Sequence, residues 1–435
     1  MQIIEKNNKK LIRSWSMYDW ANSAYNLVIT STIFPAYYTA ITKTEENGDV
    51  VNFFGLKVVN TALSNFALAG AYLLMAFTLP FISSYADVKG KKRPIMMFFT
   101  YMGALSCMGL FFFRLETLEV SIILFALAAM GYIGGVLFNN SYLPEIATVD
   151  QQDRVSAQGF AYGYVGCVTL QIICLLFVLK PDWFGITDAS FGARFSFFLV
   201  GLWWAGFSTI PFRALPNNQG SAIKASKNLF RIVVLEYRIV YRKIKKITAI
   251  RRFLPAYFFY SAGVQTVMIV AAAFGAKELQ LESSKLIITI LLIQLLAIGG
   301  AVLMSRLSQR FGNIRVLLSV VCVWIIICVS AFYVQTETQF YLLACLVGIV
   351  MGGIQSLSRS TYSKFLPENI KDTTSFFSFY DITEKLAIVV GLFSFAFIEQ
   401  ATRNIRYSAV SLSIFFILGL LLLVRLLKSQ KTEIS

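Results

Sequence analysis

Long apolar stretches separated by short polar breaks recur along the whole 435-residue chain. A helix needs about 20 mainly apolar residues to cross the roughly 30 Å hydrocarbon core of a bilayer, and this chain has about twelve such stretches. We therefore expect about twelve transmembrane helices. They are predicted at 15–41, 58–85, 94–114, 120–145, 155–179, 191–213, 253–276, 286–308, 314–334, 338–364, 374–399 and 406–428.

The composition favours lipid over water as the main solvent, because 57% of the residues are apolar and only 14% are charged. The chain contains no histidine, which excludes a histidine proton relay and a histidine-ligated metal site. It also lacks a Gly-x-x-x-x-Gly-Lys-Ser/Thr phosphate loop, so ATP-driven pumping by this chain is not expected. We predict no cofactor, no metal and no enzymatic activity, and any coupled proton would have to be carried by carboxylates.

The formal charge of +16 is concentrated in one loop, between Arg213 and Arg252. Basic loops of membrane proteins face the cytoplasm, which predicts a multi-pass protein of a bacterial-type inner membrane with both termini inside. Within this loop Leu229–Ile250 is amphipathic, and we expect it to lie on anionic lipid headgroups. Nucleic acid is not an expected partner.

An internal repeat predicts two related halves. Ser83–Arg93 follows the second predicted helix and Ser305–Arg315 follows the eighth, with a serine, a glycine and a final arginine in the same register. The expected fold is an all-α membrane protein made of two pseudo-symmetric six-helix bundles. We expect the protein to be a monomer. The predicted units are 1–213, the basic cytoplasmic linker 214–252, and 253–435.

These two loops resemble the cytoplasmic signature of the major facilitator superfamily, in which an acid near a helix end pairs with nearby bases and a glycine permits a tight turn. Asp87 and Gly90 match this pattern, whereas Gln309 replaces the acid in the second copy. The resemblance implies a cytoplasmic gate. Its predicted members are Asp87, Gly90, Arg93, Gln309, Gly312 and Arg315.

A more specific motif, Tyr18–Tyr25, reads Tyr-Asp-Trp-Ala-Asn-Ser-Ala-Tyr and resembles the hallmark of the vacuole-effluxer-like, or unknown major facilitator, family. Fungal members of that family are implicated in exporting amino acids from the vacuole, which implies an amino-acid-like substrate. The seventh helix departs from the family pattern Tyr-x-Asp-Gly, because Ala262 stands in place of the aspartate. If that aspartate carries ions or protons in relatives, Ala262 cannot do so here.

Ionisable groups inside membrane helices are costly and are rarely kept without a partner or a function. In the first helix Asp19 shares a face with Asn22, beside Tyr18, and could bind an ammonium group, accept a proton or tie the helix to a neighbour. In the eleventh helix Lys385 lies one turn from Asp381. The two could form a static ion pair or a pair that breaks and re-forms during transport. The predicted coupling residues are Tyr18, Asp19, Asn22, Tyr380, Asp381, Glu384 and Lys385.

Cavity residues are expected on the first, fourth, seventh and tenth helices, which line the cavity in the superfamily that these motifs resemble. The candidates are Asn139, Asn140, Gln265, Gln355 and Arg359. The glutamines could equally bond a neighbouring helix, and Arg359 could extend to lipid headgroups.

We predict a secondary active transporter that moves a small solute by alternating access, with proton coupling and direction left open. One alternative is efflux of an amphipathic compound or lipid. Another is a membrane sensor or scaffold that does not transport. The partners expected are a small-molecule substrate, protons if transport is proton-coupled, and the lipid bilayer.

Overall fold

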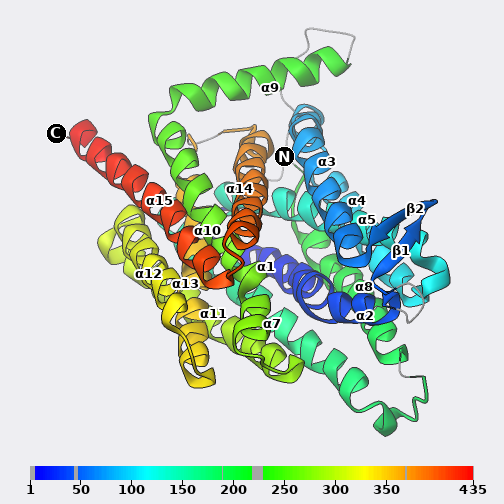
Figure 1. Cartoon of the computed structure of the whole chain (residues 1–435). Coiled ribbons are helices and arrows are strands. Elements are labelled where there is room, and N and C mark those ends of the chain that lie inside the picture. Colours follow the sequence, from blue (N-terminus) through cyan, green and yellow to red (C-terminus); the bar gives the residue numbers. More distant parts are fainter. Residues whose placement is uncertain (1–4, 44–47, 189, 218–228, 368–369, 435) are drawn as a thin grey trace.

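The computed structural model describes residues 5–43, 48–188, 190–217, 229–367 and 370–434, so part of the predicted linker, residues 218–228, lies outside the described residues. Two helical bundles lie side by side, and helix α9 crosses one end of them (Figure 1). All twelve predicted apolar stretches are helical in the structure. The architecture is that of the major facilitator fold.

The N-terminal half opens with a long helix in three parts and a small antiparallel hairpin that the sequence did not predict. The parts are α1 (Lys9–Ala24), a π-helical stretch (Tyr25–Thr32) and α2 (Ile33–Thr42), and the hairpin joins β1 (Val50–Phe53) to β2 (Leu56–Val59). The remaining elements are α3 (Asn60–Lys89), α4 (Lys92–Gly109), 3₁₀ turns at Leu110–Phe112 and Leu115–Thr117, α5 (Leu118–Asn140), α6 (Leu143–Ile146), α7 (Gln152–Leu179), a 3₁₀ turn at Pro181–Phe184, and α8 (Phe191–Ala214).

The C-terminal half follows a helix that lies between the two bundles in the sequence. That helix is α9 (Leu229–Lys246). The half itself comprises α10 (Thr248–Glu278), α11 (Ser283–Phe311), α12 (Asn313–Tyr333), α13 (Glu337–Lys364), α14 (Thr373–Thr402) and α15 (Ile405–Ile434).

Ten helices in the described chain are long and apolar enough to cross a membrane. Two further segments complete the predicted twelve but depart from a simple apolar helix. The first, α1 to α2, is interrupted by the π-helical stretch, and α14 carries Asp381, Glu384 and Lys385 within its length. Both departures lie where the two halves meet.

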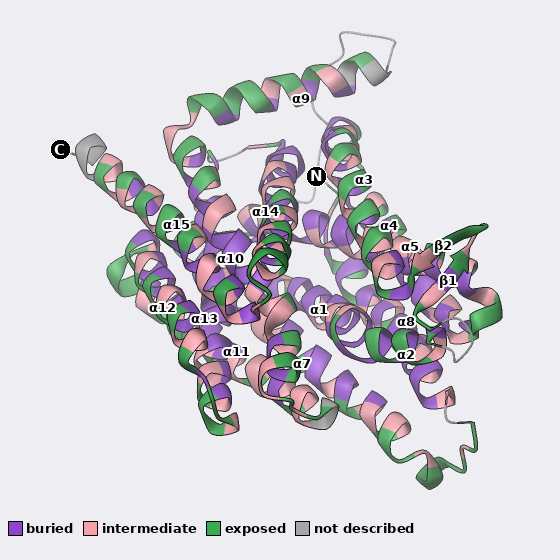
Figure 2. Ribbon diagram, in the orientation of Figure 1, coloured by how far each residue is buried: buried purple, intermediate pink, exposed green. Residues whose placement is uncertain are grey.

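The outer surface of the bundles is apolar, as a lipid environment requires. Large phenylalanines project from it, while buried positions lie toward the interior of each bundle (Figure 2). Phe66, Phe77, Phe98, Phe393 and Phe397 are among the most exposed. Such side chains would be unfavourable in water but are favourable against acyl chains.

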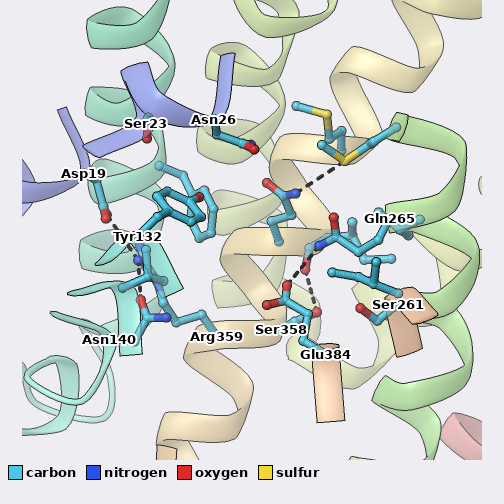
Figure 3. A pocket seen from close by; sticks show the side chains of 18 of the residues that line it. Asp19, Ser23, Asn26, Tyr132, Asn140, Ser261, Gln265, Ser358, Arg359 and Glu384 are labelled. Atoms are coloured by element: carbon cyan, nitrogen blue, oxygen red, sulfur yellow. Dashed lines mark hydrogen bonds and ion pairs between the residues drawn. The ribbon is translucent and has the colours of Figure 1, made fainter. Parts of the chain in front are cut away.

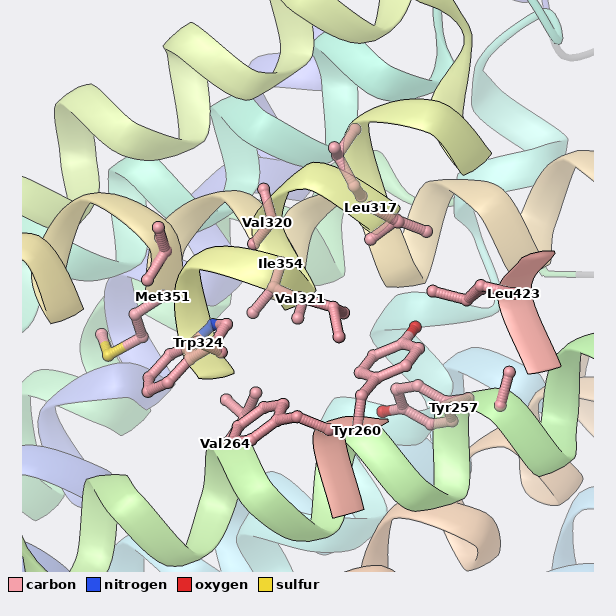
Figure 4. Packing of buried hydrophobic residues seen from close by; sticks show 14 of the residues in the cluster. Tyr257, Tyr260, Val264, Leu317, Val320, Val321, Trp324, Met351, Ile354 and Leu423 are labelled. Atoms are coloured by element: carbon pink, nitrogen blue, oxygen red, sulfur yellow. The ribbon is translucent and has the colours of Figure 1, made fainter. Parts of the chain in front are cut away.

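Tight interior packing makes each half a coherent body. In the C-terminal half Trp324 stacks on Phe416 with ring centroids 5.5 Å apart, inside a buried cluster contributed by several helices (Figure 4). Phe416 also lies so close to Gly263 that a Cβ there would come within 2.5 Å of the ring. The C-terminal half is therefore closely packed.

The predicted tight turns of the two repeat copies are present. Gly90 ends α3 at φ 65°, and Gly312 joins α11 to α12 at φ 84°, both in the region that favours glycine. Each turn brings the next membrane helix back antiparallel to the one before it.

The halves meet along two sides, through three main helix pairs. α3 packs against α14 on one side, and α7 packs against α11 and α13 on the other. The space that these pairings enclose contains the candidate site.

Candidate functional site

A cavity of about 170 Å³ lies between the two halves. Its walls come from α1, the π-helical stretch, α3, α5 and α7 of the N-terminal half and from α10, α11, α13 and α14 of the C-terminal half. The polar side chains point toward one another across it (Figure 3). Asn22 Nδ2 and Gln294 Oε1 have no hydrogen-bond partner within the described residues. Amide groups in this position can bond a polar ligand. The uncharged polar lining includes Asn22, Asn26, Gln265, Gln294, Gln355 and Ser358.

Asp19 and Arg359 form a buried ion pair that joins the halves. Asp19 Oδ2 lies 3.1 Å from Arg359 Nη1, and Asp19 Oδ1 accepts a hydrogen bond of 3.2 Å from Asn139. Arg359 also donates to Asn140 Oδ1 at 2.9 Å and to the side chain and backbone of Ser156 at 3.0 and 2.8 Å. Its guanidinium is buried among helices, so the interpretation that Arg359 extends to lipid headgroups is wrong.

The environment of Arg359 explains how a charge persists there. Its guanidinium lies 4.2 Å from the ring centroid of Phe160 and 4.9 Å from that of Trp15. Aromatic faces attract cations when water is excluded. Gly159 permits this arrangement, because a Cβ at that position would come within 2.4 Å of Asp19 Oδ2.

A second charged group lies on α14. Lys385 Nζ is 2.8 Å from Glu384 Oε2 and 3.6 Å from Asp381 Oδ1. Gln265 donates to Glu384 Oε1 at 2.9 Å from α10, and Asp381 Oδ2 has no hydrogen-bond partner within the described chain. Two carboxyl groups thus share one lysine, which leaves excess negative charge when both are ionised. A buried site of this composition favours binding a proton or a cationic group.

Tyrosines form much of the remaining cavity wall, and of these only Tyr380 was predicted from the sequence. Tyr257 stacks on Tyr380 at 4.3 Å between ring centroids, and Tyr164 donates to Gln355 Oε1 at 2.7 Å across the boundary between the halves. Tyr72 and Tyr132 also line the cavity from the N-terminal half. These rings offer flat apolar surface together with hydroxyl groups.

Contacts between the halves gather at the end of the bundle that α9 crosses, and we call them the α9-side closure. At one point Asp87, near the end of α3, accepts hydrogen bonds of 2.7 Å from both the backbone N–H and the hydroxyl of Ser375. Ser375 belongs to the first turn of α14, where unpaired N–H groups and the helix dipole favour an anion. Asp87 therefore joins the halves, with Lys92 of its own loop also within electrostatic range.

Next to this contact Lys92 and Glu145 pair at 2.8 Å, and both reach Thr373 of the other half. Thr373 donates to Glu145 Oε1 at 2.6 Å. Lys92 Nζ also lies 4.0 Å from the ring centroid of Tyr142. The first turn of α14 is thus held at two of its residues.

A third contact connects α7 to the C-terminal half. Asp153 accepts hydrogen bonds from Lys364 at 2.5 Å, Ser308 at 2.9 Å and Asn313 at 2.7 Å. Ser308 and Asn313 belong to the second repeat copy. Asp153 therefore provides a carboxylate to the second repeat copy, which has Gln309 where the first copy has an acid.

The structure brings together most of the predicted site residues but separates others. Asp19, Asn22, Asn140, Gln265, Gln355, Arg359, Tyr380, Glu384 and Lys385 line the cavity. Asn139 and Asp381 bind lining residues from behind, and Tyr18 points into the N-terminal half, where its hydroxyl lies 2.9 Å from that of Thr100.

The predicted gate residues also differ in position. Arg93 donates to the backbone of Leu215 within its own half at 3.0 Å, while Gln309, Gly312 and Arg315 are exposed. Ala262 is buried beside Gly391 of α14, and its neighbour Ser261 lines the cavity. A carboxylate at 262 would therefore lie at a helix contact.

The family profile described as Vacuole effluxer Atg22 like matches residues 7–433. The chain is 30% identical to the uncharacterized MFS-type transporter YxiO of Bacillus subtilis, over 99% of this chain and 98% of that protein. It is 28% identical to autophagy-related protein 22 of Cryptococcus neoformans over 62% of this chain, and that match spans half of the fungal protein. Among solved structures, the human organic anion transporter MFSD10 superposes with a TM-score of 0.73 at 11% identity, covering 96% of this chain and all of that one. The chain therefore belongs to the Atg22-like vacuole effluxer family and is a membrane transporter of the major facilitator superfamily.

Proposed function

We propose that this transporter is a secondary active carrier that moves a small, polar, amino-acid-like solute across the inner membrane by alternating access. The main support for the proposal is a cavity between two rigid halves. Two charged groups line this cavity, and hydrogen bonds next to it link the halves at one end. A site of this kind can be exposed alternately if the contacts on either side of it break and re-form.

The α9-side closure supplies contacts suited to such a cycle. Its bonds are charge-assisted and join short segments, such as Asp87 to Ser375 and Asp153 to Lys364. Each can exchange its partner for water when that end opens, so the cost of opening is moderate compared with separating packed apolar surfaces. The positively charged α9 end is proposed to face the cytoplasm, with both termini on that side.

Coupling to protons is proposed to involve the carboxyl groups of α14 and α1. Asp381 and Glu384 compete for Lys385, so a proton taken up by one acid leaves the lysine paired with the other. Asp19 is held by Arg359 of the opposite half, and protonation of Asp19 would weaken that contact. Substrate, protonation and closure are thereby linked through residues that border one cavity.

The cavity composition favours an amino-acid-like solute over a lipid. Glu384 offers an acceptor for an ammonium group, while Arg359 and the amide groups offer donors for a carboxylate. Burying an acyl chain against these charged groups would leave them without solvation. We therefore propose that a monomer carries a small molecule, which binds at this one site.

Transport by purified protein in liposomes tests the proposal. Labelled neutral amino acids are offered with and without a proton gradient, and the wild type is compared with Lys385→Ala. The matched control is Lys277→Ala, which removes a lysine that pairs with Glu399 at an exposed position away from the cavity. We expect uptake to be lost in Lys385→Ala and retained in the control, and wild-type uptake by Lys385→Ala would contradict the proposed coupling.

A further inference from the structure

Helix α9 lies across the ends of α3, α14 and α10, at the same end of the molecule as the α9-side closure (Figure 1). Its inward face is a continuous stripe, because the buried positions recur at three- and four-residue spacing. They are Val233, Glu236, Val240 and Ile244. The helix is therefore docked on both halves rather than held away from them.

The outward face of α9 is basic and partly apolar. Arg238, Arg242, Lys245 and Lys246 are all exposed, and so are Leu235 and Tyr241, at 45% and 43%. Lys245 Nζ lies 4.6 Å from the ring centroid of Tyr241. A helix with this surface, beside the ends of membrane-crossing helices, matches the headgroup region of an anionic leaflet, where bases meet phosphates and a few apolar groups enter the interface.

The inward face connects α9 to the closure through α14. Lys243 pairs with Asp372, which directly precedes α14 and the closure residues Thr373 and Ser375. Glu236 lies near the same carboxylate, with Lys243 and Asp87 also within electrostatic range. Burial, followed by the like charge of Asp372, raises the pKa of Glu236 to about 8, which favours its neutral form in the docked helix.

We propose that the outward face of α9 binds anionic phospholipid headgroups, and that this binding stabilises the α9-side closure through Lys243 and Asp372. Charge complementarity identifies the occupant, since four exposed bases lie on one face of a helix that packs across the ends of membrane-crossing helices. Any ligand that binds the docked helix better than the undocked one shifts the equilibrium toward the closed end. This role of α9 is separate from binding of the solute and does not depend on which solute is carried.

Hydrogen exchange of the full-length protein in nanodiscs tests this directly. Nanodiscs of phosphatidylcholine alone are compared with nanodiscs in which phosphatidylglycerol replaces part of it. Amides of α9 and of the first turn of α14 are expected to exchange about tenfold more slowly with the anionic lipid. The free energy that corresponds to this change is a small part of the attraction between four bases and an anionic leaflet. Equal exchange in the two lipids would overturn the proposal, whether or not the protein transports amino acids.

Two sets of variants separate lipid binding from its transmission. Neutralising Arg238, Arg242, Lys245 and Lys246 to glutamine is expected to abolish the lipid effect at both segments. The matched control neutralises four exposed bases in the segments that connect helices at the other end of the bundle, and it is expected to keep the effect. These are Lys43, Lys57, Arg114 and Lys180.

The variant Lys243→Gln tests the transmission step. It is expected to keep lipid-dependent protection in α9 and to lose it at the first turn of α14. Lipid-dependent protection of α14 that persists in Lys243→Gln would overturn the proposed link to the closure.

Discussion

Replacing Arg359 by glutamine tests whether the ion pair between the halves stabilises this closed arrangement. The substitution leaves Asp19 buried, with the hydrogen bond from Asn139 as its remaining side-chain partner in the structure. It also removes the donors that reach Asn140 and Ser156. We expect a lower free energy of unfolding and a weaker closure.

The magnitude follows from the burial of the pair. Removing one partner of a buried ion pair costs about 3–5 kcal/mol, and we take about 3 because Asn139 still bonds the carboxylate. An unfolding entropy of about 2.1 cal/mol/K per residue gives roughly 0.9 kcal/mol/K for a chain of this length. The midpoint of thermal unfolding should therefore fall by about 3 °C.

A double-mutant cycle with Asp19→Asn provides the decisive measurement. Thermal unfolding in detergent, followed by tryptophan fluorescence, is recorded for the wild type, both single variants and the double variant. Because Asp19→Asn removes the charge that Arg359→Gln leaves unpaired, we expect a coupling of about 2 kcal/mol. Strictly additive effects would refute the reasoning, since they would mean that the two side chains do not interact in the folded protein.

Three further predictions address other parts of the structure. The neutral form of Glu236 stabilises the docked α9, so its contribution is complete below the ordinary pKa of 4.5 and is lost as the pH rises through about 8. The fluorescence anisotropy of a fluorophore attached to Leu235→Cys should therefore fall over that pH range. The fall should be absent when Glu236→Gln is added. Asp87→Asn should weaken the bonds to Ser375 by about 1.5–3 kcal/mol, and unchanged distances between spin labels on the two halves would argue against this. Gly163→Ala should destabilise the protein by about 1–3 kcal/mol because its Cβ would lie 2.6 Å from a side-chain oxygen of α1, whereas Gly206→Ala has open space and should unfold at the wild-type temperature.

The membrane-crossing helices were predictable because their signal is local: an apolar run of sufficient length identifies itself without reference to any other segment. The turns at Gly90 and Gly312 were predictable for the same reason. Several predicted helices are shorter than the observed ones, as for 286–308 within Ser283–Phe311, because polar helix ends extend beyond the apolar core.

The closure could not be predicted from the same sequence. Asp153 and Lys364 are 211 residues apart, and no spacing rule relates them. Sequence position placed Arg359 near the end of a membrane helix, where an extended side chain would reach the headgroups, but tertiary packing supplies a buried acid and two aromatic faces instead. Long-range partners decide the environment of such a charge, and a single sequence does not contain them.

The π-helical stretch Tyr25–Thr32 has a consequence for how the first helix tolerates insertions and deletions. The backbone N–H of Ile33 donates to the carbonyl of Val28, five residues earlier, so this segment holds about one more residue per turn than an α-helix would. The side-chain hydroxyls of Ser31 and Thr32 likewise donate to the carbonyls of Asn26 and Leu27. Deleting a single residue here and restoring ordinary winding would leave the helix beyond it in nearly the same rotational position, because the wider turn already absorbs the extra residue. Phe34 would keep its aromatic neighbours, whereas the same deletion in regular α-helix would rotate everything beyond it by about 100°. The π-helical stretch is therefore where the first helix can lose one residue without misaligning the part that borders the cavity and the part that anchors it.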